Sequence, residues 1–249
     1  MRRRLDGATA VVTGATSGIG LATSRLLADH GCRVVLVGRD QVALRRAARQ
    51  TGGVECLVDL TSPDAADTVV RAAGGQVDLL VNNAGVGWAG PLEAMPADQL
   101  GSLVEINLVA PLRLTRAVLP GMLARGDGHL VLVSSIAGYM GVAGEAVYAA
   151  TKAGLRAFAD SLRLEAADRG IGVSLIVPGA VDTNFFRRRG QPYSRRLPRM
   201  ASADAVAREV LHAVQRDTAE VFVPRWLRLP ARLRGAVPRA VDVLQRRLG

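Results

Sequence analysis

The sequence has few aromatic residues, only two cysteines and no long hydrophobic run. Aromatic residues make up 4% of its 249 positions, so the core must be built from Ala, Val and Leu. Cys32 and Cys56 are isolated, which excludes a disulfide framework and predicts two buried thiols and no metal site. No run of about 18 apolar residues occurs, and no signal-peptide core follows the basic residues 1–4, so we predict a cytoplasmic protein.

Lysine is almost absent from this basic chain. Lys and Arg total 32, and Lys152 is the only lysine among them. Arginine carries a planar fork of donors, whereas the ammonium of lysine is compact and its pKa shifts easily. A chain that uses arginine almost everywhere but keeps an ammonium here indicates a chemical role for Lys152. The net charge of +10 gathers in the C-terminal quarter, away from this residue.

The residues around Lys152 predict a proton-transfer site. Tyr148 precedes Lys152 by four positions, so the two side chains share one face of a predicted helix. A free tyrosine has a pKa of about 10, and we expect the ammonium to lower that pKa towards neutrality. Ser135 lies 13 positions before Tyr148, across a glycine-rich loop, where its hydroxyl can stabilise developing oxygen charge. The plainer interpretation is a chance lysine beside a surface tyrosine.

Apolar runs alternate with helical patterns along the chain. Strands are expected at 8–13, 33–37, 54–58, 79–81, 129–133, 173–177 and 220–223. This order predicts an α/β fold, a Rossmann-like doubly wound parallel sheet of about seven strands with helices on both faces. We expect one domain over residues 1–224, with an arginine-rich substrate loop at about 184–201, followed by a basic C-terminal extension at 225–249.

The first predicted strand leads into a glycine-rich turn, in which Gly14, Gly18 and Gly20 open a helix. Glycines let backbone amides approach a pyrophosphate at a helix N-terminus. At the end of the second strand, where an NAD site would place an acid, stands Arg39 after a glycine. Arg39 can pair with a 2′-phosphate, which favours NADP(H) over NAD(H). The plainer interpretation of Arg39 is one more solvated arginine.

Asn107 lies in a long helical pattern over 97–124, four positions before Pro111. Because proline has no N–H, the carbonyl of Asn107 loses its helical partner. We expect a bend there and a free acceptor that holds a water near Tyr148 and Lys152. The plainer interpretation is a proline kink with the amide on the surface.

Taken together, these motifs resemble the single-domain branch of the short-chain dehydrogenase/reductase family. Over about residues 5–224 they follow that family's order: Thr13-Gly14-x3-Gly18-Ile19-Gly20, Asp59, Asn82-Asn83-Ala84-Gly85, Ser135, Tyr148-x3-Lys152 and Pro178-Gly179 to Thr183. The resemblance implies an oxidoreductase that interconverts a carbonyl and a secondary alcohol with a nicotinamide cofactor. It also implies a homodimer or homotetramer.

The resemblance implies a role for each matching residue. Tyr148 would exchange the proton with the substrate oxygen, Ser135 would orient that oxygen, and Lys152 would hold the nicotinamide ribose. Asn107 would hold a water between Lys152 and solvent. With Arg39, the predicted cofactor-binding set is completed by Gly14, Ser17, Gly18, Ile19, Gly20, Asp59, Asn83, Gly85, Pro178, Gly179 and Thr183.

Partner choice stays open at several points. The arginines at 187–199 either attract an acidic or acyl-carrier-linked substrate or form a solvated lid. The favoured interpretation of the C-terminal extension is a solvated tail that packs on the sheet edge or on another subunit. The other interpretation places it on an anionic membrane surface, which its prolines at 224, 230 and 238 disfavour. Nucleic-acid binding is not predicted, because no aromatic residues interleave with the arginines. The alternative function is a catalytically silent nucleotide-sensing or interaction protein, whose signature would be loss of Tyr148 or Lys152.

Overall fold

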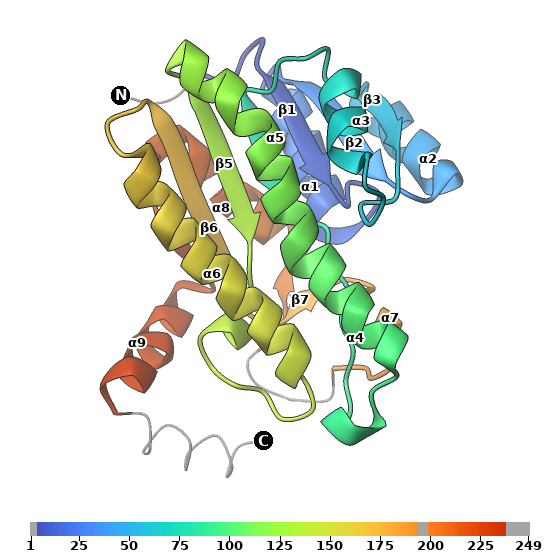
Figure 1. Cartoon of the computed structure of the whole chain (residues 1–249), viewed down its shortest axis with the longest axis vertical. Coiled ribbons are helices and arrows are strands. Elements are labelled where there is room, and N and C mark those ends of the chain that lie inside the picture. Colours follow the sequence, from blue (N-terminus) through green and yellow to red (C-terminus); the bar gives the residue numbers. More distant parts are fainter. Residues whose placement is uncertain (1–3, 194–198, 238–249) are drawn as a thin grey trace.

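The computed structural model of the chain describes residues 4–193 and 199–237 (Figure 1). Its centre is a seven-stranded parallel sheet in the order β3-β2-β1-β4-β5-β6-β9. The strands are β1 (Thr9–Thr13), β2 (Arg33–Gly38), β3 (Val54–Leu57), β4 (Leu79–Asn82), β5 (Gly128–Val133), β6 (Ile171–Pro178) and β9 (Glu220–Val223). The predicted doubly wound parallel sheet is confirmed.

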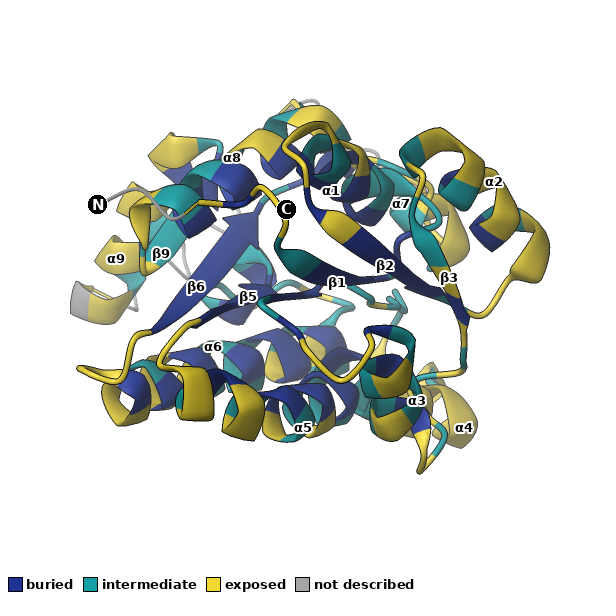
Figure 2. Ribbon diagram, turned by 90° about the horizontal axis from the view of Figure 1, so that it is seen from above, coloured by how far each residue is buried: buried dark blue, intermediate teal, exposed yellow. Residues whose placement is uncertain are grey.

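Helices cover both faces of this sheet (Figure 2). One face carries α1 (Gly18–Asp29), α2 (Gln41–Thr51) and α8 (Ala203–Arg216). The other carries α3 (Ala65–Ala72), α4 (Ala97–Val104), α5 (Ala110–Arg125) and α6 (Ala146–Ala166). Outside these layers are the paired strands β7 (Val181–Asp182) and β8 (Ala201–Ser202), the helices α7 (Phe185–Arg188) and α9 (Arg228–Ala236), and the 3-10 turns Leu92–Ala94, Ile136–Gly138 and Arg225–Leu227.

Alternation along each strand sends aliphatic side chains into two cores, one on each face. On β1, Val11 packs in the core beneath α5 and α6, whereas Ala10 and Val12 pack in the core beneath α1 and α8. The largest fully buried side chains are leucines and Met122, as the shortage of aromatic residues predicts. Each such leucine contributes about 1.5–3 kcal/mol by leaving water.

Both cysteines are buried free thiols, as predicted. Burial raises the pKa of Cys32 to about 11 and also raises the pKa of Cys56. Over residues 4–193 and 199–237, no cluster of three metal-binding side chains occurs. No helix in the same ranges is long and apolar enough to cross a membrane.

Local hydrogen bonds explain where the helices begin. Asp40 caps α2 by accepting from the amide of Ala43 at 3.0 Å. Ser202 caps α8 through the amide of Ala205 at 3.1 Å. The helix α3 starts only after a turn. Asp59 accepts from the Thr61 amide at 2.9 Å, which forms a separate turn before the helix begins at Ala65.

The helix predicted over 97–124 is interrupted by a π-helical turn at Glu105–Val109. In this turn the amide of Ala110 bonds the carbonyl of Glu105, five residues earlier. Pro111 follows at once and cannot donate to the carbonyl of Asn107. The predicted bend therefore takes the form of a wider turn, which is a form often found at functional sites. Asn107 is 0% exposed, so the interpretation as a surface amide is wrong.

A short helix forms in the basic C-terminal segment despite its prolines. Pro230 lies in the first turn of α9, where a missing N–H removes no helical bond. Leu227 and Ala231 are buried in the core on the α6 side and hold this helix to the domain. The remainder of the segment, 238–249, lies outside the described residues.

Candidate active site

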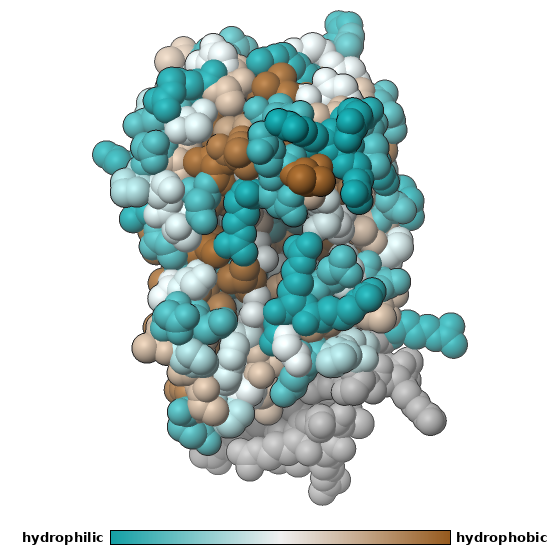
Figure 3. Space-filling view, turned by 90° about the vertical axis from the view of Figure 1, so that its right-hand side faces the viewer, coloured by the Kyte–Doolittle hydropathy of each residue, from teal (hydrophilic) through white to brown (hydrophobic). Residues whose placement is uncertain are grey.

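A large cavity opens where the carboxyl ends of the parallel strands meet. Its volume is about 890 Å³. It lies where the strand order reverses between β1 and β4, which is where open parallel sheets bind ligands. Figure 3 shows a largely hydrophilic face of the molecule with hydrophobic surface gathered around a central hollow. The predicted site residues that line the cavity are Gly14, Ser17, Gly18, Ile19, Arg39, Asn83, Gly85, Ser135, Tyr148, Lys152, Pro178, Gly179 and Thr183.

Three predicted site residues do not line the cavity. Gly20 supports the glycine turn, because a Cβ there would lie 2.3 Å from the carbonyl oxygen of Gly14. Asp59 accepts hydrogen bonds from the amide and hydroxyl of Thr61, and these bonds lower its pKa. Asn107 lies beneath Gly85. The predicted roles of Gly20 and Asp59 toward a cofactor, and of Asn107 toward a water, stay predictions.

The glycine turn between β1 and α1 is held open by its neighbours. Gly14 and Gly18 have φ of +64° and +53°, a conformation that favours glycine. Asn83 joins β4 to the turn, because its side-chain amide donates to the carbonyl of Thr13 at 2.8 Å. Ser17 is the N-cap residue of α1, and its side chain makes no capping bond. The first amides of α1 are thus left without a side-chain acceptor, which fits an anionic phosphate.

The end of β2 is crowded at the position where an NAD site carries its acid. A Cβ on Gly38 would lie 2.9 Å from the methyl carbon of Thr16. Arg39 follows, is exposed and lines the cavity. The cation is therefore placed at the rim where the ribose end of a dinucleotide would lie.

The catalytic candidates come from β5 and α6. Ser135 follows β5, and its Oγ accepts from the amide of Ala137 at 3.2 Å, so its hydroxyl proton is left to donate elsewhere. Tyr148 and Lys152 lie on one face of α6 and are 8% and 4% exposed. Ser134 fixes α6 against β5, because its hydroxyl donates to the carbonyl of Lys152 at 3.0 Å. The structure thus brings Ser135, Tyr148 and Lys152 together, as predicted.

The protonation of this group differs from the prediction. Burial raises the pKa of Tyr148 to about 12, although a hydrogen bond with Ser135 acts to lower it. Burial also lowers the pKa of Lys152 to about 8. The Nζ atom of Lys152 donates to the carbonyl of Val133 at 3.0 Å and stands 5.8 Å from the centroid of the Tyr148 ring. The predicted lowering of the Tyr148 pKa by Lys152 is wrong for this arrangement, because burial dominates.

Asn107 positions the loop that follows β4. Its side-chain oxygen accepts from the amide of Val86 and its NH₂ group donates to the carbonyl of Val86, both at 2.9 Å. The same NH₂ group donates to the hydroxyl of Thr151 at 3.3 Å. That hydroxyl in turn donates to the carbonyl of Tyr148 at 2.7 Å. The buried amide therefore ties the loop to α6 between Tyr148 and Lys152.

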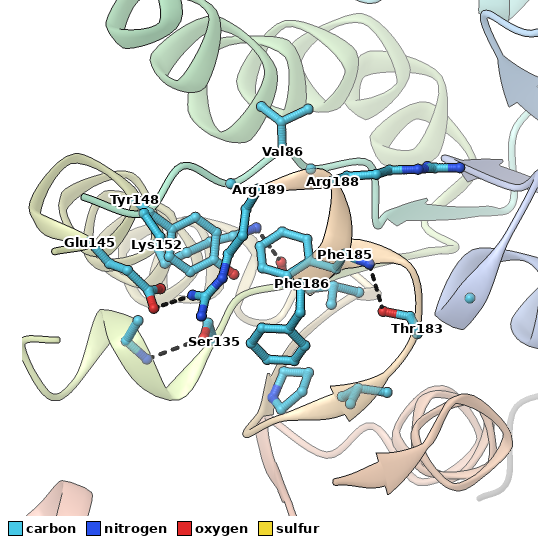
Figure 4. Close-up of a pocket in the computed structure, with 18 of the residues that line it drawn as sticks. Val86, Ser135, Glu145, Tyr148, Lys152, Thr183, Phe185, Phe186, Arg188 and Arg189 are labelled. Atoms are coloured by element: carbon cyan, nitrogen blue, oxygen red, sulfur yellow. Dashed lines mark hydrogen bonds and ion pairs between the residues drawn. The ribbon is translucent and has the colours of Figure 1, made fainter. Parts of the chain in front are cut away.

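Sequence reasoning missed the side chains that close the cavity over Tyr148. The short helix α7, within the predicted substrate loop, places the ring of Phe185 with its centroid 5.5 Å from that of Tyr148 (Figure 4). Its close approach depends on a neighbouring glycine, because a Cβ on Gly87 would lie 2.7 Å from Phe185.

An ion pair holds α7 in place. Arg189, directly after α7, pairs with Glu145, directly before α6, and the two side chains are 10% and 13% exposed. The guanidinium also stacks 4.6 Å from the centroid of Phe186. Arg189 and Glu145 are 44 residues apart in the sequence. The only sequence signal for this ion pair was the basic character of the loop.

The chain is similar to known proteins of one enzyme family. The profile of the family described as short chain dehydrogenase matches residues 8–194. The chain is 37% identical over 186 residues to the 3-oxoacyl-acyl-carrier-protein reductase FabG of Vibrio cholerae, which covers 73% of this chain and 76% of that protein.

Two solved structures are similar over nearly the whole chain. A short-chain dehydrogenase from Sphingobium yanoikuyae in complex with NADPH has a TM-score of 0.81 and 29% identity, covering 93% of this chain and 95% of the other. A short chain dehydrogenase/reductase from Burkholderia phymatum in complex with NAD has a TM-score of 0.86 and 25% identity, covering 94% and 95%. Nicotinamide cofactors of both kinds therefore occur among the similar structures.

Proposed function

Because the chain belongs to the short-chain dehydrogenase family, we propose that it is an NADP(H)-dependent carbonyl reductase with Tyr148 as the proton donor. Oxidoreductases of this family act on CH–OH and C=O groups with a nicotinamide cofactor. The observation that carries the proposal is the group on one cavity wall: Tyr148, hydrogen-bonded to Ser135, with Lys152 one helical turn further along α6.

The cavity's residues fit a dinucleotide along its length. The glycine turn and the uncapped first turn of α1 would hold the phosphates. Lys152 and Thr183 would hold the nicotinamide end, because both line the cavity beside the catalytic group. When bound, the cofactor supplies the hydride, and the chain's own residues supply position and the proton.

The protonation of Tyr148 fits the role of proton donor in carbonyl reduction. With a pKa of about 12 its phenol keeps the proton at neutral pH, so it can donate to a carbonyl oxygen that gains charge. Ser135 can turn its hydroxyl proton from Tyr148 to the same substrate oxygen, while its Oγ keeps accepting from the amide of Ala137. Both features fit carbonyl reduction, and the same two groups would act in reverse for alcohol oxidation.

Arg39 supports a preference for NADP(H). It lines the cavity at the end of β2, and the position of Gly38 beside it, where an NAD site carries the acid that binds the ribose hydroxyls, is crowded. An arginine fork there would bind a 2′-phosphate with two hydrogen bonds. The pairing of Arg39 with that phosphate is our proposal for the cofactor preference.

The substrate end of the cavity is mostly apolar around Tyr148. Its lining there includes Leu103, Val142 and Phe185, beside the paired charges of Glu145 and Arg189. We propose a carbonyl borne on an apolar acyl or ring substrate, with an acyl-carrier-linked compound as one form of it, since FabG is named for such a substrate. A cytoplasmic location and a homodimer or homotetramer stay predictions.

The test is Tyr148→Phe, which removes the transferable proton and keeps the ring. We expect turnover of a carbonyl panel with NADPH to fall by about 10²–10⁴-fold, the usual contribution of a general acid. Binding of NADPH, followed by fluorescence, should change by less than about twofold, since the phenol is not the anchor of the phosphates. Tyr139→Phe is the matched control, because Tyr139 bonds Glu220 outside the cavity. Full activity of Tyr148→Phe would refute the assignment of Tyr148 as proton donor. Wild-type chain that binds NADPH but reduces no carbonyl of the panel would favour the silent-sensor alternative.

A further inference from the structure

The C-terminal helix carries an apolar stripe that faces solvent. We define the stripe as Trp226, Leu229, Leu233 and Val237, which are 56%, 66%, 44% and 49% exposed. The spacing of three and four residues places them along one side of the turn Arg225–Leu227 and of α9. Large exposed apolar residues that line up in this way mark a surface that binds something.

The opposite side of the same segment packs against the rest of the domain. Leu227 and Ala231 are 4% and 7% exposed and pack in the core on the α6 side. A Cβ on Gly179 would lie 2.8 Å from a methyl group of Leu227, which shows how closely this turn approaches β6. Figures 1 and 2 show α9 at the β9 edge of the sheet, outside the two helix layers. Packing within the domain therefore accounts for the buried side and leaves the stripe unexplained.

Arginines border the stripe. Arg225, Arg228 and Arg232 are exposed, Arg234 is half-buried, and residues 225–237 contain no Asp or Glu. The side chain of Arg225 approaches Glu209 of α8 at 3.5 Å while remaining 79% exposed. An apolar stripe with cations along its borders is the pattern of a helix that lies flat in a lipid interface.

Charge decides between a lipid surface and a second copy of this chain. A twofold contact pairs a patch with itself, so it would bring the arginines of both copies face to face without acidic partners from residues 225–237. Anionic lipid headgroups supply the opposite sign, while their acyl region takes up the leucines and the tryptophan.

We propose that the stripe Trp226, Leu229, Leu233 and Val237, with its bordering arginines, docks the enzyme on an anionic membrane surface. The buried side of the docking segment touches the active site, because Leu227 lines the catalytic cavity. Docking therefore brings one border of that cavity to the lipid surface, where apolar carbonyl compounds are concentrated.

The first experiment is co-sedimentation of the full chain with vesicles of phosphatidylcholine, with and without about 30% phosphatidylglycerol. The salt concentration is about 0.1 M, at which charges at the membrane surface still act over about 10 Å. We expect binding to the anionic vesicles and little to the neutral ones. The double variant Arg228→Gln/Arg232→Gln should bind about 25-fold more weakly, from the loss of two arginines near the surface. Leu229→Ser/Leu233→Ser should weaken binding at least about tenfold by removing the inserted side chains.

Matched controls come from α2, whose Val42 is 70% exposed and whose Arg45 is exposed. Val42→Ser and Arg45→Gln should leave vesicle binding unchanged. A direct readout is the emission of Trp226 in a Trp88→Phe background, because the chain has two tryptophans. The emission should shift to the blue with anionic vesicles only.

Two outcomes would overturn the proposal. One is a failure of the vesicle-binding test: the wild-type chain stays in the supernatant with anionic vesicles, or Leu229→Ser/Leu233→Ser binds them as well as the wild type does. The other is a change in subunit assembly: without lipid, Leu229→Ser/Leu233→Ser sediments at a different velocity from the wild type, and its vesicle binding is intact. That result would assign the stripe to a contact between subunits.

Discussion

Replacing Arg189 by methionine is expected to open α7 without unfolding the domain. Methionine keeps an apolar stem against Phe186 but leaves Glu145 unpaired at a site where the pair is 10% and 13% exposed. Removing one partner of a buried ion pair costs about 3–5 kcal/mol. Because some exposure remains, we take the lower end, about 3 kcal/mol, which corresponds to roughly 100-fold more frequent opening.

Hydrogen exchange of two amides in α7 and just after it measures this opening. The amide of Arg188 bonds the carbonyl of Asn184 at 2.9 Å, and the amide of Arg189 bonds the carbonyl of Phe185 at 3.0 Å. In Arg189→Met both positions should exchange about 100-fold faster, while the amides of β5 and α6 keep their protection. The matched control is Arg187→Met, since Arg187 is an exposed arginine of the same helix.

The same substitution should also appear in the pH dependence of catalysis. Arg189 lowers the pKa of Tyr148 and Glu145 raises it, although burial is the larger cause. Arg189→Met should therefore shift the alkaline limb of the reduction profile upward, and Glu145→Gln should shift it downward. Equal exchange in wild type and Arg189→Met, or the same acceleration in Arg187→Met, would refute the reasoning that this pair holds α7 closed.

Two further predictions concern Lys152 and Arg39. Burial lowers the pKa of Lys152 from 10.5 to about 8, so between these values the unfolded chain binds one more proton and stability rises with pH. Lys152→Met should then stabilise the fold in urea by up to about 3 kcal/mol near pH 7 and by less at pH 10, and equal gains would contradict this. Arg39→Gln should weaken NADPH binding in calorimetry at least about tenfold and leave NADH within twofold, whereas a parallel loss would rule out 2′-phosphate recognition.

Features set by a few neighbouring residues could be predicted from the sequence. The apolar runs located the strands to within one or two residues, because parallel strands are buried on both faces. The cap at Asp40 and the glycine turn were predictable for the same reason, since each depends on backbone geometry within a few positions. That Ser135, Tyr148 and Lys152 lie close together was also predictable, because they belong to one strand, one loop and one helix that follow one another along the chain.

Features set by contacts between distant segments were not predictable. The π-helical turn at Glu105–Val109 contains Asn107, whose side chain bonds Val86, 21 residues away. The closure by α7 depends on the pair of Glu145 with Arg189. The direction of the Tyr148 pKa shift was predicted wrongly. The shift is caused mainly by burial under other segments, and spacing along a helix carries no information about burial.

The position of the only lysine now has a structural reason. Lys152 is 4% exposed, with its Nζ atom 3.0 Å from the carbonyl of Val133 and 3.6 Å from where a Cβ on Gly85 would stand. A guanidinium has five donors and keeps its charge whatever its surroundings, so burial there would be costly. An ammonium can lose its proton when it is buried. Burial lowers the pKa of Lys152 to about 8 and raises that of Tyr148 to about 12. Burial thus keeps the transferable proton on Tyr148, the group that faces the substrate end of the cavity.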